Sequence, residues 1–409
     1  MACSQAPQPA RKSDLAAHSS FNSDFDSTLA MISTFPPTRC GLATYAEDLI
    51  AAMRAVSPRS RVLRVAVEAL TENQNAGADF VIRRSDGDGW KNAAQWLSES
   101  GVKFALLQHE FKIFGGNFGS DILGLLEERP CSFVTTLHTV SRRVRGRRLE
   151  VLQRICALSE CVVVHTSESK RVLHSLDVDW AKIHVIPHGV PTLPFEPPGV
   201  YQSRDVVRPL FLSFGHLRRS KGYELALSAL ARLRDDGIAF QYWICGKDHP
   251  RPKSAAAYRT ELVAKVAETG LQDHVCFIDN YLTSEQLARI VKACDVGILP
   301  YKRVEQASSG TLPFFFACGR PVVASAFRAA CEIVDSECGR LFPVNKVDDL
   351  YRALKEIASA PQLRAKMMLC AHEKARAWGW HIVANEYMNI LGASVTSGVT
   401  GRLEWFRWN

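Results

Sequence analysis

The stretch Leu210-Phe211-Leu212-Ser213-Phe214-Gly215-His216-Leu217-Arg218-Arg219-Ser220-Lys221-Gly222 decides the fold. A short apolar run is followed by a glycine that permits a tight turn, and then by fixed cations, with a helix expected to begin near Ser220. A strand that turns directly into a helix is typical of parallel sheets, and helix amides beside cations bind anions such as a diphosphate. The stretch therefore predicts an α/β protein with an anion site at a strand end.

The same alternation of short apolar runs and longer amphipathic segments extends through most of the chain. In the first half we expect strands at Leu29–Thr34, Arg61–Val67, Phe104–Gln108, Phe133–Leu137, Cys161–His165 and Ile183–Ile186. In the second half we expect them at Leu210–Phe214, Phe240–Cys245, His274–Ile278, Val296–Leu299 and Pro321–Ala324. Helical patterns such as Thr44–Ala55 and Leu149–Leu158 lie between them. This alternation predicts two doubly wound Rossmann-like domains that face each other across a cleft.

The chain divides into five expected segments. Residues 1–28 are rich in Ser, Ala, Pro, Asp and Gln, which predicts a disordered leader. Residues 29–190 form the N-terminal domain, the proline-rich residues 191–208 a linker, and residues 209–379 the C-terminal domain. Residues 380–409 hold a last helical stretch, Trp380–Leu391, that is long enough to return toward the N-terminal domain, and a tail.

Composition excludes several classes of protein. Of the 409 residues, 47% are hydrophobic and 22% charged, which is ordinary for a soluble globular protein. The net charge of +8 fits an anionic partner or a solvated excess, but a nucleic-acid partner is disfavoured because interleaved aromatic residues and a broad basic face are missing. No run reaches roughly 18 apolar residues, so we expect a cytoplasmic protein with at most peripheral contact at the inner membrane face.

The twelve cysteines form no CxxC pair. Six of them lie in apolar runs, which predicts buried, reduced thiols in a reducing compartment: Cys156, Cys161, Cys245, Cys276, Cys294 and Cys318.

A second polar stretch, Glu305-Gln306-Ala307-Ser308-Ser309-Gly310-Thr311-Leu312-Pro313, offers hydroxyls and amides at a helix start. Ser308 or Ser309 can cap the helix, and Gly310 permits close approach of the backbone to a ligand. Because one hydroxyl is enough for a cap, Ser308, Ser309 and Thr311 together exceed the structural need. The stretch therefore predicts the second half of a diphosphate clamp.

Polar residues also follow the strands of the first half. Gly41 begins a helix after a loop, and Gln108-His109-Glu110 and His138 follow two strands directly. A lone His is more often a packed side chain, but strand-end placement favours a site for both His109 and His138. Metal binding by this pair is disfavoured because further ligands are missing.

The run Arg142-Arg143-Val144-Arg145-Gly146-Arg147-Arg148 is basic. It is either a solvated helix entry or a contact, through Arg142 and Arg143, with a phosphate on an acceptor or with anionic lipid.

These features together resemble the retaining glycosyltransferases of the GT-B fold, called family 4 or group 1. The resemblance covers Leu29 to about Leu391. It rests on the loop at Cys40-Gly41, on His138 and on further stretches, namely Ile186-Pro187-His188-Gly189-Val190, Gly215 to Gly222, Ala293-Cys294-Asp295-Val296-Gly297-Ile298-Leu299-Pro300 and Ala317-Cys318-Gly319-Arg320-Pro321-Val322-Val323-Ala324-Ser325.

The resemblance implies roles for some residues, and it shows where this sequence departs from the family pattern. It places Gly41 by the donor phosphates, His138 by the transferred sugar, and Lys221 on the diphosphate. The family's arginine falls at His216, so Arg218 is the expected substitute. The family's two glutamates fall at Gln306 and Phe314, counted back from Ala317. Gln306 can still bind a sugar hydroxyl, whereas Phe314 cannot accept a bond from a ribose, which fits a transfer dominated by leaving-group stabilisation.

The predicted function is retaining, metal-independent hexosyl transfer from a nucleoside diphosphate sugar, GDP- or UDP-linked, to a glycan or lipid-linked acceptor in polysaccharide biosynthesis. We favour guanine and mannose on the resemblance. No cofactor is expected. The catalytic residues are expected to be His138, Arg218, Lys221 and Gln306. The donor contacts are expected to be Gly41, Gly215, Gly246, Lys247, Asn280, Tyr281, Leu282, Ser308, Ser309, Gly310 and Thr311.

We expect the N-terminal domain to bind the acceptor through His109, Glu110, Arg142 and Arg143, and the C-terminal domain to bind the nucleotide sugar. The alternatives are a catalytically silent GT-B protein that binds a nucleotide or sugar, and a GT-B epimerase or phosphorylase.

Overall fold

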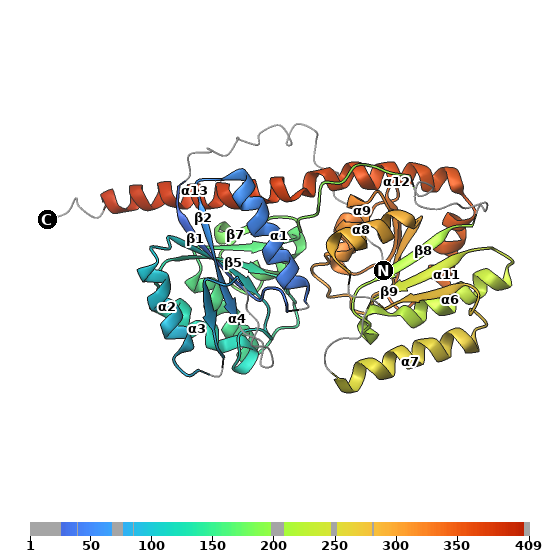
Figure 1. Cartoon of the computed structure of the whole chain (residues 1–409), viewed down its shortest axis with the longest axis horizontal. Helices are drawn as coiled ribbons and strands as arrows, with labels where there is room; N and C mark the ends of the chain where they lie inside the picture. Colours follow the sequence, from blue (N-terminus) through green and yellow to red (C-terminus); the bar gives the residue numbers. More distant parts are fainter. Residues whose placement is uncertain are drawn as a thin grey trace.

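The computed structural model describes residues 26–38, 40–67, 77–84, 86–197, 208–246, 252–279 and 282–404. Two parallel β-sheets, each covered by helices on both faces, form two lobes side by side (Figure 1). We call the half that contains the first sheet the first lobe, and the half that contains the second sheet the second lobe. The predicted α/β architecture of two doubly wound Rossmann-like units is therefore confirmed.

The first lobe has a seven-stranded sheet in the order β3-β2-β1-β4-β5-β6-β7. Its strands are β1 Thr28–Ser33, β2 Arg61–Val67, β3 Phe80–Ile82, β4 Phe104–His109, β5 Ser132–Leu137, β6 Cys161–Val164 and β7 Ile183–Val185. Its helices are α1 Gly41–Val56, α2 Gly89–Glu99, α3 Leu123–Glu128, α4 Arg147–Leu158 and α5 Ser167–His174. Every residue of the central strand β4 is buried, because helices cover both faces of a parallel sheet.

The second lobe has a six-stranded sheet in the order β10-β9-β8-β11-β12-β13. Its strands are β8 Leu210–Phe214, β9 Gln241–Cys245, β10 Val275–Ile278, β11 Val296–Leu299, β12 Val322–Ser325 and β13 Gly339–Phe342. The helices that follow β8 are α6 Tyr223–Asp235, α7 Pro252–Glu268, α8 Ser284–Ala293, α9 Thr311–Ala317, α10 Arg328–Ile333, α11 Val347–Ala358, α12 Pro361–Ala375 and α13 Trp380–Glu404. Strands β3 and β13, each at the edge of its sheet, were not predicted.

Two chain segments connect the lobes. Val190 and Trp380 lie beside each other, with the Val190 N–H donating to the Trp378 carbonyl at 2.9 Å and the Trp380 N–H donating to the Val190 carbonyl at 3.0 Å. Helix α13 then runs back along the first lobe and packs against α1, burying Tyr387 and Leu391 in that lobe's core (Figure 1). The helix continues to Glu404, well past the predicted end at Leu391.

The thiols largely follow expectation. None of the eleven cysteines in the described part of the chain is disulfide-bonded, and Cys156, Cys245, Cys294 and Cys318 are buried. The prediction of burial was wrong for Cys276, which is exposed because β10 is an edge strand, and Cys161 is only partly buried.

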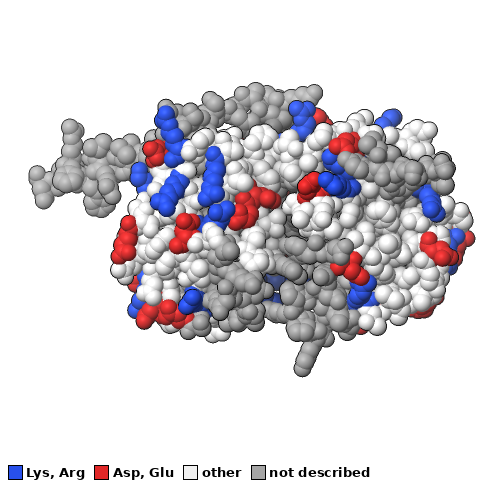
Figure 2. All heavy atoms as spheres, in the orientation of Figure 1, with Lys and Arg blue, Asp and Glu red and all other residues white. Residues whose placement is uncertain are grey.

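The surface and the helices bear on the expected partners. On the face drawn in Figure 2, basic and acidic side chains are intermixed over the first lobe rather than separated by sign. Within the described ranges, no helix combines the length and the apolar character needed to cross a bilayer.

Candidate functional site

The first of the two polar stretches singled out in the second half lies against the loop that leads to the second. The backbone N–H of Lys302 donates to the carbonyl of Ser220 at 3.0 Å. Gly222 has a left-handed backbone (φ 69°) and packs on Pro300 so closely that a Cβ there would overlap the Pro300 carbonyl oxygen. Only glycine fits both conditions. The turn after β8 and the loop after β11 therefore form one continuous surface at the carboxyl ends of these strands.

Lys221 supplies the unneutralised positive charge of this surface. Its ammonium lies 3.7 Å from the centroid of the Tyr301 ring and has no carboxylate partner among the described residues. The ring attracts the cation without cancelling its charge. Arg218 is exposed on the same turn, whereas Arg219 forms an ion pair with Glu261. Of Lys221 and Arg219, Lys221 is therefore the cation without a carboxylate partner in the described ranges.

The helix after this turn begins later than predicted. Arg219–Lys221 form one 3₁₀ turn, and α6 starts at Tyr223 with Gly222 as its N-cap residue. A glycine has no side chain that could accept a bond from the helix amides. The backbone amides nearest Lys221 therefore belong to the 3₁₀ turn and not to the first turn of α6, which corrects the expected start near Ser220.

The loop before α9 contacts the first lobe through Ser308. The Ser308 hydroxyl donates to the carbonyl of His138 at 2.7 Å, and the Gln306 Nε2 donates to the Ser308 carbonyl at 2.8 Å. These bonds place Gln306 beside the end of β5 and leave the Gln306 Oε1 as an acceptor for a substrate hydroxyl. The structure thus brings His138, Gln306 and Ser308 together from two lobes.

The hydroxyls at the start of α9 have separate roles. The Ser309 hydroxyl accepts the Leu312 N–H at 3.4 Å, and Ser309 is buried just before the N-cap residue Gly310, so it satisfies one amide of the first turn of α9. Ser308 is also engaged, which corrects the expectation of surplus hydroxyls: Thr311 has the only one of the three hydroxyls without a hydrogen bond inside the described part of the chain. A Cβ on Gly310 would lie 2.9 Å from the His188 Nε2, so this loop also packs tightly on the first lobe.

Phe314 stands at the position of the family's second glutamate. Its ring meets the ring of Phe214 edge-on, with 5.8 Å between centroids, at the carboxyl end of β8. An apolar surface therefore replaces a carboxylate here.

A chain of hydrogen bonds runs through two histidines of the first lobe, His138 and His165, next to the loop before α9. Gln108 Oε1 lies 2.9 Å from the His138 Nε2, His138 Nδ1 lies 3.3 Å from the His165 Nε2, and His165 Nδ1 lies 3.0 Å from the Ile186 carbonyl oxygen. Both ring nitrogens of His138 are therefore engaged. This corrects the expectation that the ring orients the sugar directly, and leaves the His138 backbone and its bond to Ser308 as the link to the cleft.

The protonation of the two histidines depends on this chain. The Ile186 carbonyl can only accept, so His165 Nδ1 carries a proton, and in a neutral pair His138 Nδ1 carries the other. When His138 and His165 are both neutral, all three bonds form if Gln108 donates its amide NH₂ to the His138 Nε2. If Gln108 instead accepts with its carbonyl oxygen, the histidine pair must carry one extra proton. Burial lowers the pKa of His138 well below its usual range and that of His165 to about 3, so the neutral pair dominates at pH 7.

The sequence interpretation missed the residues that surround His138. The Tyr45 ring on α1 has its centroid 4.8 Å from that of His138, 5.0 Å from that of His188 and 5.1 Å from that of Trp380 on α13. One signal pointed to His165, because it is the third histidine at the end of a strand in the first half. No local pattern pointed to Tyr45 or Trp380.

A cavity of about 180 Å³ lies between the lobes next to these histidines. The first lobe lines it with His165 and His188, and the second lobe with Ser308, Ser309 and Glu332. The loop before α9 therefore has the interlobe space on one side and the Lys221 surface close by.

The structure separates the residues expected to contact the acceptor. His109 is fully buried between the rings of Phe111 and Phe114, and burial lowers its pKa to about 3. This corrects the expectation of a direct acceptor contact for His109. Glu110 is half-buried and accepts a hydrogen bond from the Thr139 hydroxyl, and burial raises the pKa of its carboxyl.

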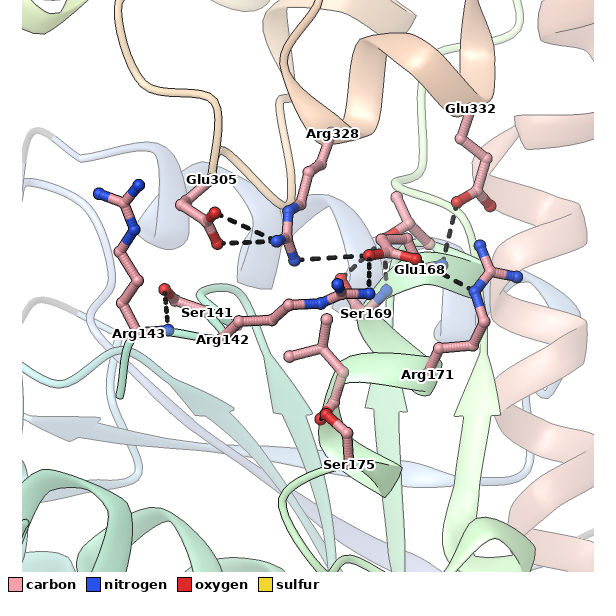
Figure 3. A network of polar contacts seen from close by, with 12 residues as sticks. Ser141, Arg142, Arg143, Glu168, Ser169, Arg171, Ser175, Glu305, Arg328 and Glu332 are labelled. Atoms are coloured by element: carbon pink, nitrogen blue, oxygen red, sulfur yellow. Dashed lines mark hydrogen bonds and ion pairs between the residues drawn. The ribbon is translucent and has the colours of Figure 1, made fainter. Parts of the chain in front are cut away.

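The two arginines of the basic run differ in their surroundings. Arg142 Nη2 lies 2.8 Å from the Glu168 Oε1, so its charge is already paired (Figure 3). Arg143 projects from the same loop and is exposed, with its backbone N–H donating to the Ser141 hydroxyl. Of the pair, Arg143 is the one available to an acceptor phosphate.

The remaining donor residues lie partly outside the described ranges. Lys247, Asn280 and Tyr281 fall there, and their roles stay predictions. Leu282 is half-buried against the core of the second lobe. Gly41 is the first residue of α1 with open space at its Cβ position.

Two of the donor glycines allow the strand ends to meet. A Cβ on Gly246 would overlap the carbonyl oxygen of Gly215, so these glycines let the ends of β8 and β9 approach each other. No cluster of three His, Cys, Asp or Glu side chains suited to a metal ion occurs in the described ranges.

Two family models cover most of the chain. Residues 40–192 match the model described as Glycosyltransferase Family 4, and residues 202–373 match the model described as Glycosyl transferases group 1. The chain belongs to the group 1/family 4 glycosyltransferases. This confirms the resemblance stated from the sequence. The first model matches the first lobe and the second model the second lobe.

Curated relatives of this glycosyltransferase match it over part of their length. It is 26% identical over 190 residues to a 2-deoxystreptamine glucosyltransferase of Streptomyces kanamyceticus, covering 45% of this chain and 46% of the relative. It is 26% identical over 236 residues to an MMP alpha-(1->4)-mannosyltransferase of Mycolicibacterium hassiacum, covering 57% and 54%. The matches thus span about half the length of these relatives.

Solved structures share the fold of this glycosyltransferase along almost the whole chain. Sucrose-phosphate synthase of Thermosynechococcus elongatus has a TM-score of 0.72 at 19% identity and covers 91% of this chain and 100% of its own. Anabaena HepE in complex with UDP and glucose has a TM-score of 0.69 at 14% identity and covers 90% and 100%. The two-lobed GT-B fold is therefore confirmed.

Proposed function

We propose that this glycosyltransferase moves a sugar, with retention, from a nucleoside diphosphate donor to a hydroxyl of a glycan or lipid-linked acceptor. One observation carries the proposal: Lys221 is half-buried where the ends of β8 and β11 meet, and its ammonium lies on the Tyr301 ring with no carboxylate partner in the described ranges. A cation kept unneutralised in such a place is suited to a diphosphate.

The chemistry follows from where charge develops. As the bond to the sugar breaks, negative charge grows on the departing diphosphate, and Lys221 and Arg218 stabilise it. We expect Gly310 and the Thr311 hydroxyl to contact the same diphosphate. Because a glutamine stands at position 306, the acceptor attacks on the face from which the diphosphate leaves, without a carboxylate nucleophile there.

Gln306 and the end of β5 hold the sugar. The Gln306 Oε1 accepts a sugar hydroxyl while its Nε2 stays bound to the Ser308 carbonyl. Domain closure then excludes water from the reacting centre and limits hydrolysis of the donor. A nucleoside diphosphate hexose as donor is supported by the relatives, a glucosyltransferase and a mannosyltransferase, and by the HepE complex with UDP. As the transferred sugar we favour mannose.

A thermal-shift panel of nucleoside diphosphates and their sugars tests this proposal. A ligand at 100 times its dissociation constant adds about 2.7 kcal/mol of stability, so the true donor raises the midpoint clearly. If no member of the panel changes the midpoint, the proposal is wrong.

Lys221→Ala tests the role of the Lys221 ammonium. We expect turnover at saturating donor to fall on the order of 100-fold, as for loss of one preorganised donor group. Arg219→Ala is the matched control, because Arg219 lies two residues away but is paired with Glu261 at the surface. Near-normal turnover of Lys221→Ala would refute the role of its ammonium.

A further inference from the structure

Four charged side chains join the two lobes next to the loop before α9 (Figure 3). We call them the interlobe clasp: Glu168 of α5 in the first lobe, and Glu305, Arg328 and Glu332 in the second. Arg328 Nη2 lies 3.0 Å from the Glu305 Oε2, and Arg328 Nη1 lies 3.5 Å from the Glu168 Oε1. The Arg328 side chain is 15% exposed and those of its partners 23% and 22%. These ion pairs are therefore less screened by water than ordinary surface pairs.

Glu332 closes the N-terminus of α5 from the other lobe. Its Oε1 accepts the Ser167 N–H at 2.7 Å and its Oε2 accepts the Glu168 N–H at 3.1 Å. The helix's own cap, Thr166, accepts the Ser169 N–H. A carboxylate at a helix N-terminus makes charge-assisted bonds that the helix dipole favours. If the lobes separated here, two backbone amides would lose their acceptor.

The partners of Arg328 depend on it to different degrees. Glu168 also pairs with Arg142 at 2.8 Å and with Arg171 at 3.1 Å. Glu305 pairs with Arg328 alone among the described residues. Loss of Arg328 therefore leaves Glu168 neutralised but Glu305 as a partly buried charge without a partner, which is the costly outcome.

Arg328 also holds the backbone of the loop that carries Gln306. Its N–H donates to the Val304 carbonyl at 3.0 Å, and the next N–H, of Ala329, donates to the Gln306 carbonyl at 3.1 Å. From Gln306 the contacts continue through Ser308 to the His138 carbonyl. Both the side chain and the backbone at the start of α10 thus fix this loop.

We propose that Arg328 is a positioning residue of this glycosyltransferase: by holding Glu305, it keeps Gln306 and Ser308 in place against His138. Glu332 keeps the same faces of the two lobes together. The inference rests on the proposed function, because it assigns Gln306 to the donor sugar. It adds that the loop that carries Gln306 takes its shape from the ion pair of Arg328 and Glu305, two residues that are not among those assigned to the substrates.

A double-mutant cycle of Arg328 and Glu305 tests the proposal. The variants are Arg328→Ala, Glu305→Gln and the combination of the two. For each we measure the affinity for UDP and for GDP by calorimetry, and KM and kcat with the nucleotide sugar that the wild type uses. Each single variant lowers kcat/KM on the order of tenfold, the scale of coupling between contacting residues, and the double variant lowers it no further. Arg328→Lys restores part of the loss because it keeps the charge but not the forked geometry.

Two controls separate this role from general stability. Arg352→Ala removes an exposed pair with Asp349 on α11 and leaves all readouts unchanged. Combining Arg328→Ala with Glu168→Gln gives a loss closer to the product of the single losses than the Glu305 pair does, because Glu168 also pairs with Arg142 and Arg171. The proposal is overturned if the Arg328 and Glu305 losses multiply, or if Arg328→Ala lowers only the unfolding midpoint.

Hydrogen exchange distinguishes failure of this inference from failure of the proposed function. Arg328→Ala and Glu305→Gln speed amide exchange at residues 302–310 at least about tenfold, whether or not the protein binds a nucleotide. A wild-type protein that binds no nucleotide refutes the proposed function only. Unchanged exchange in residues 302–310 refutes the positioning role.

Discussion

Gly222 is the residue whose replacement tests most sharply how the turn after β8 is joined to the loop after β11. It adopts φ 69° and ψ 27°, and a Cβ at this position would overlap the carbonyl oxygen of Pro300. Because that oxygen belongs to the backbone, it cannot yield without moving the loop that carries Tyr301. We therefore expect Gly222→Ala to displace the Tyr301 ring from beneath Lys221.

The cost has two parts. A left-handed backbone costs an alanine about 1–2 kcal/mol. Overpacking against a fixed neighbour adds about 1–3 kcal/mol. We expect the free energy of unfolding to fall by about 2–5 kcal/mol, measured by urea denaturation, and the affinity for the nucleoside diphosphate to fall with it.

Gly237→Ala is the matched control. Gly237 has a nearly identical φ of 73°, but its Cβ position has no atom within 4 Å. It should show the backbone cost of about 1–2 kcal/mol alone, with unchanged nucleotide affinity. Equal losses in the two variants would refute the close packing of the Gly222 turn on Pro300.

Three further predictions concern titrating groups. Burial, and secondarily Glu47, raise the pKa of the Asp48 carboxyl to about 6. Stability is therefore full below about pH 4 and is lost as the pH rises through 6. The free energy of unfolding of Asp48→Asn should exceed that of the wild type by up to about 3 kcal/mol at pH 8 and equal it at pH 4. The lowered pKa of His109 gives the opposite pH dependence, so stability is lost as the pH falls below 6.5. Between pH 7 and pH 5, His109→Leu should therefore lose less free energy of unfolding than the wild type, as measured by denaturation curves. For His138, ¹⁵N chemical shifts at pH 7 should place the proton on Nδ1, and a proton on Nε2 alone would contradict the hydrogen-bond chain through His165.

The sequence was sufficient for the sheets because their signal is local. Interior strands such as Phe104–His109 are buried on both faces and read as continuous apolar runs. The edge strands were missed because Phe80–Ile82 is only three residues long, and because Gly339–Phe342 is short, begins with a glycine and contains a charged residue. The late start of α6 was missed because a glycine cap gives no side-chain signal.

The positions of candidate residues could be predicted where strand ends carry polar side chains, but not the contacts that form where distant segments meet. Lys221, His138 and Ser308 follow strands or begin a helix, so their placement was predictable. Their partners were not: Ser308 reaches His138 across 170 residues, and Glu332 caps a helix that begins 165 residues earlier. Such contacts depend on how the lobes pack, which no local pattern encodes.

The anomeric configuration of the product tests the proposed function most directly. The protein is incubated with the nucleotide sugar that shifts its midpoint and with an acceptor glycan, and proton and phosphorus NMR follow the mixture. We expect nucleoside diphosphate and a new glycoside to form in equal amounts, with the anomeric configuration of the donor retained. Release of nucleoside diphosphate without a glycoside, or a product of inverted configuration, would contradict retaining transfer assisted by Lys221.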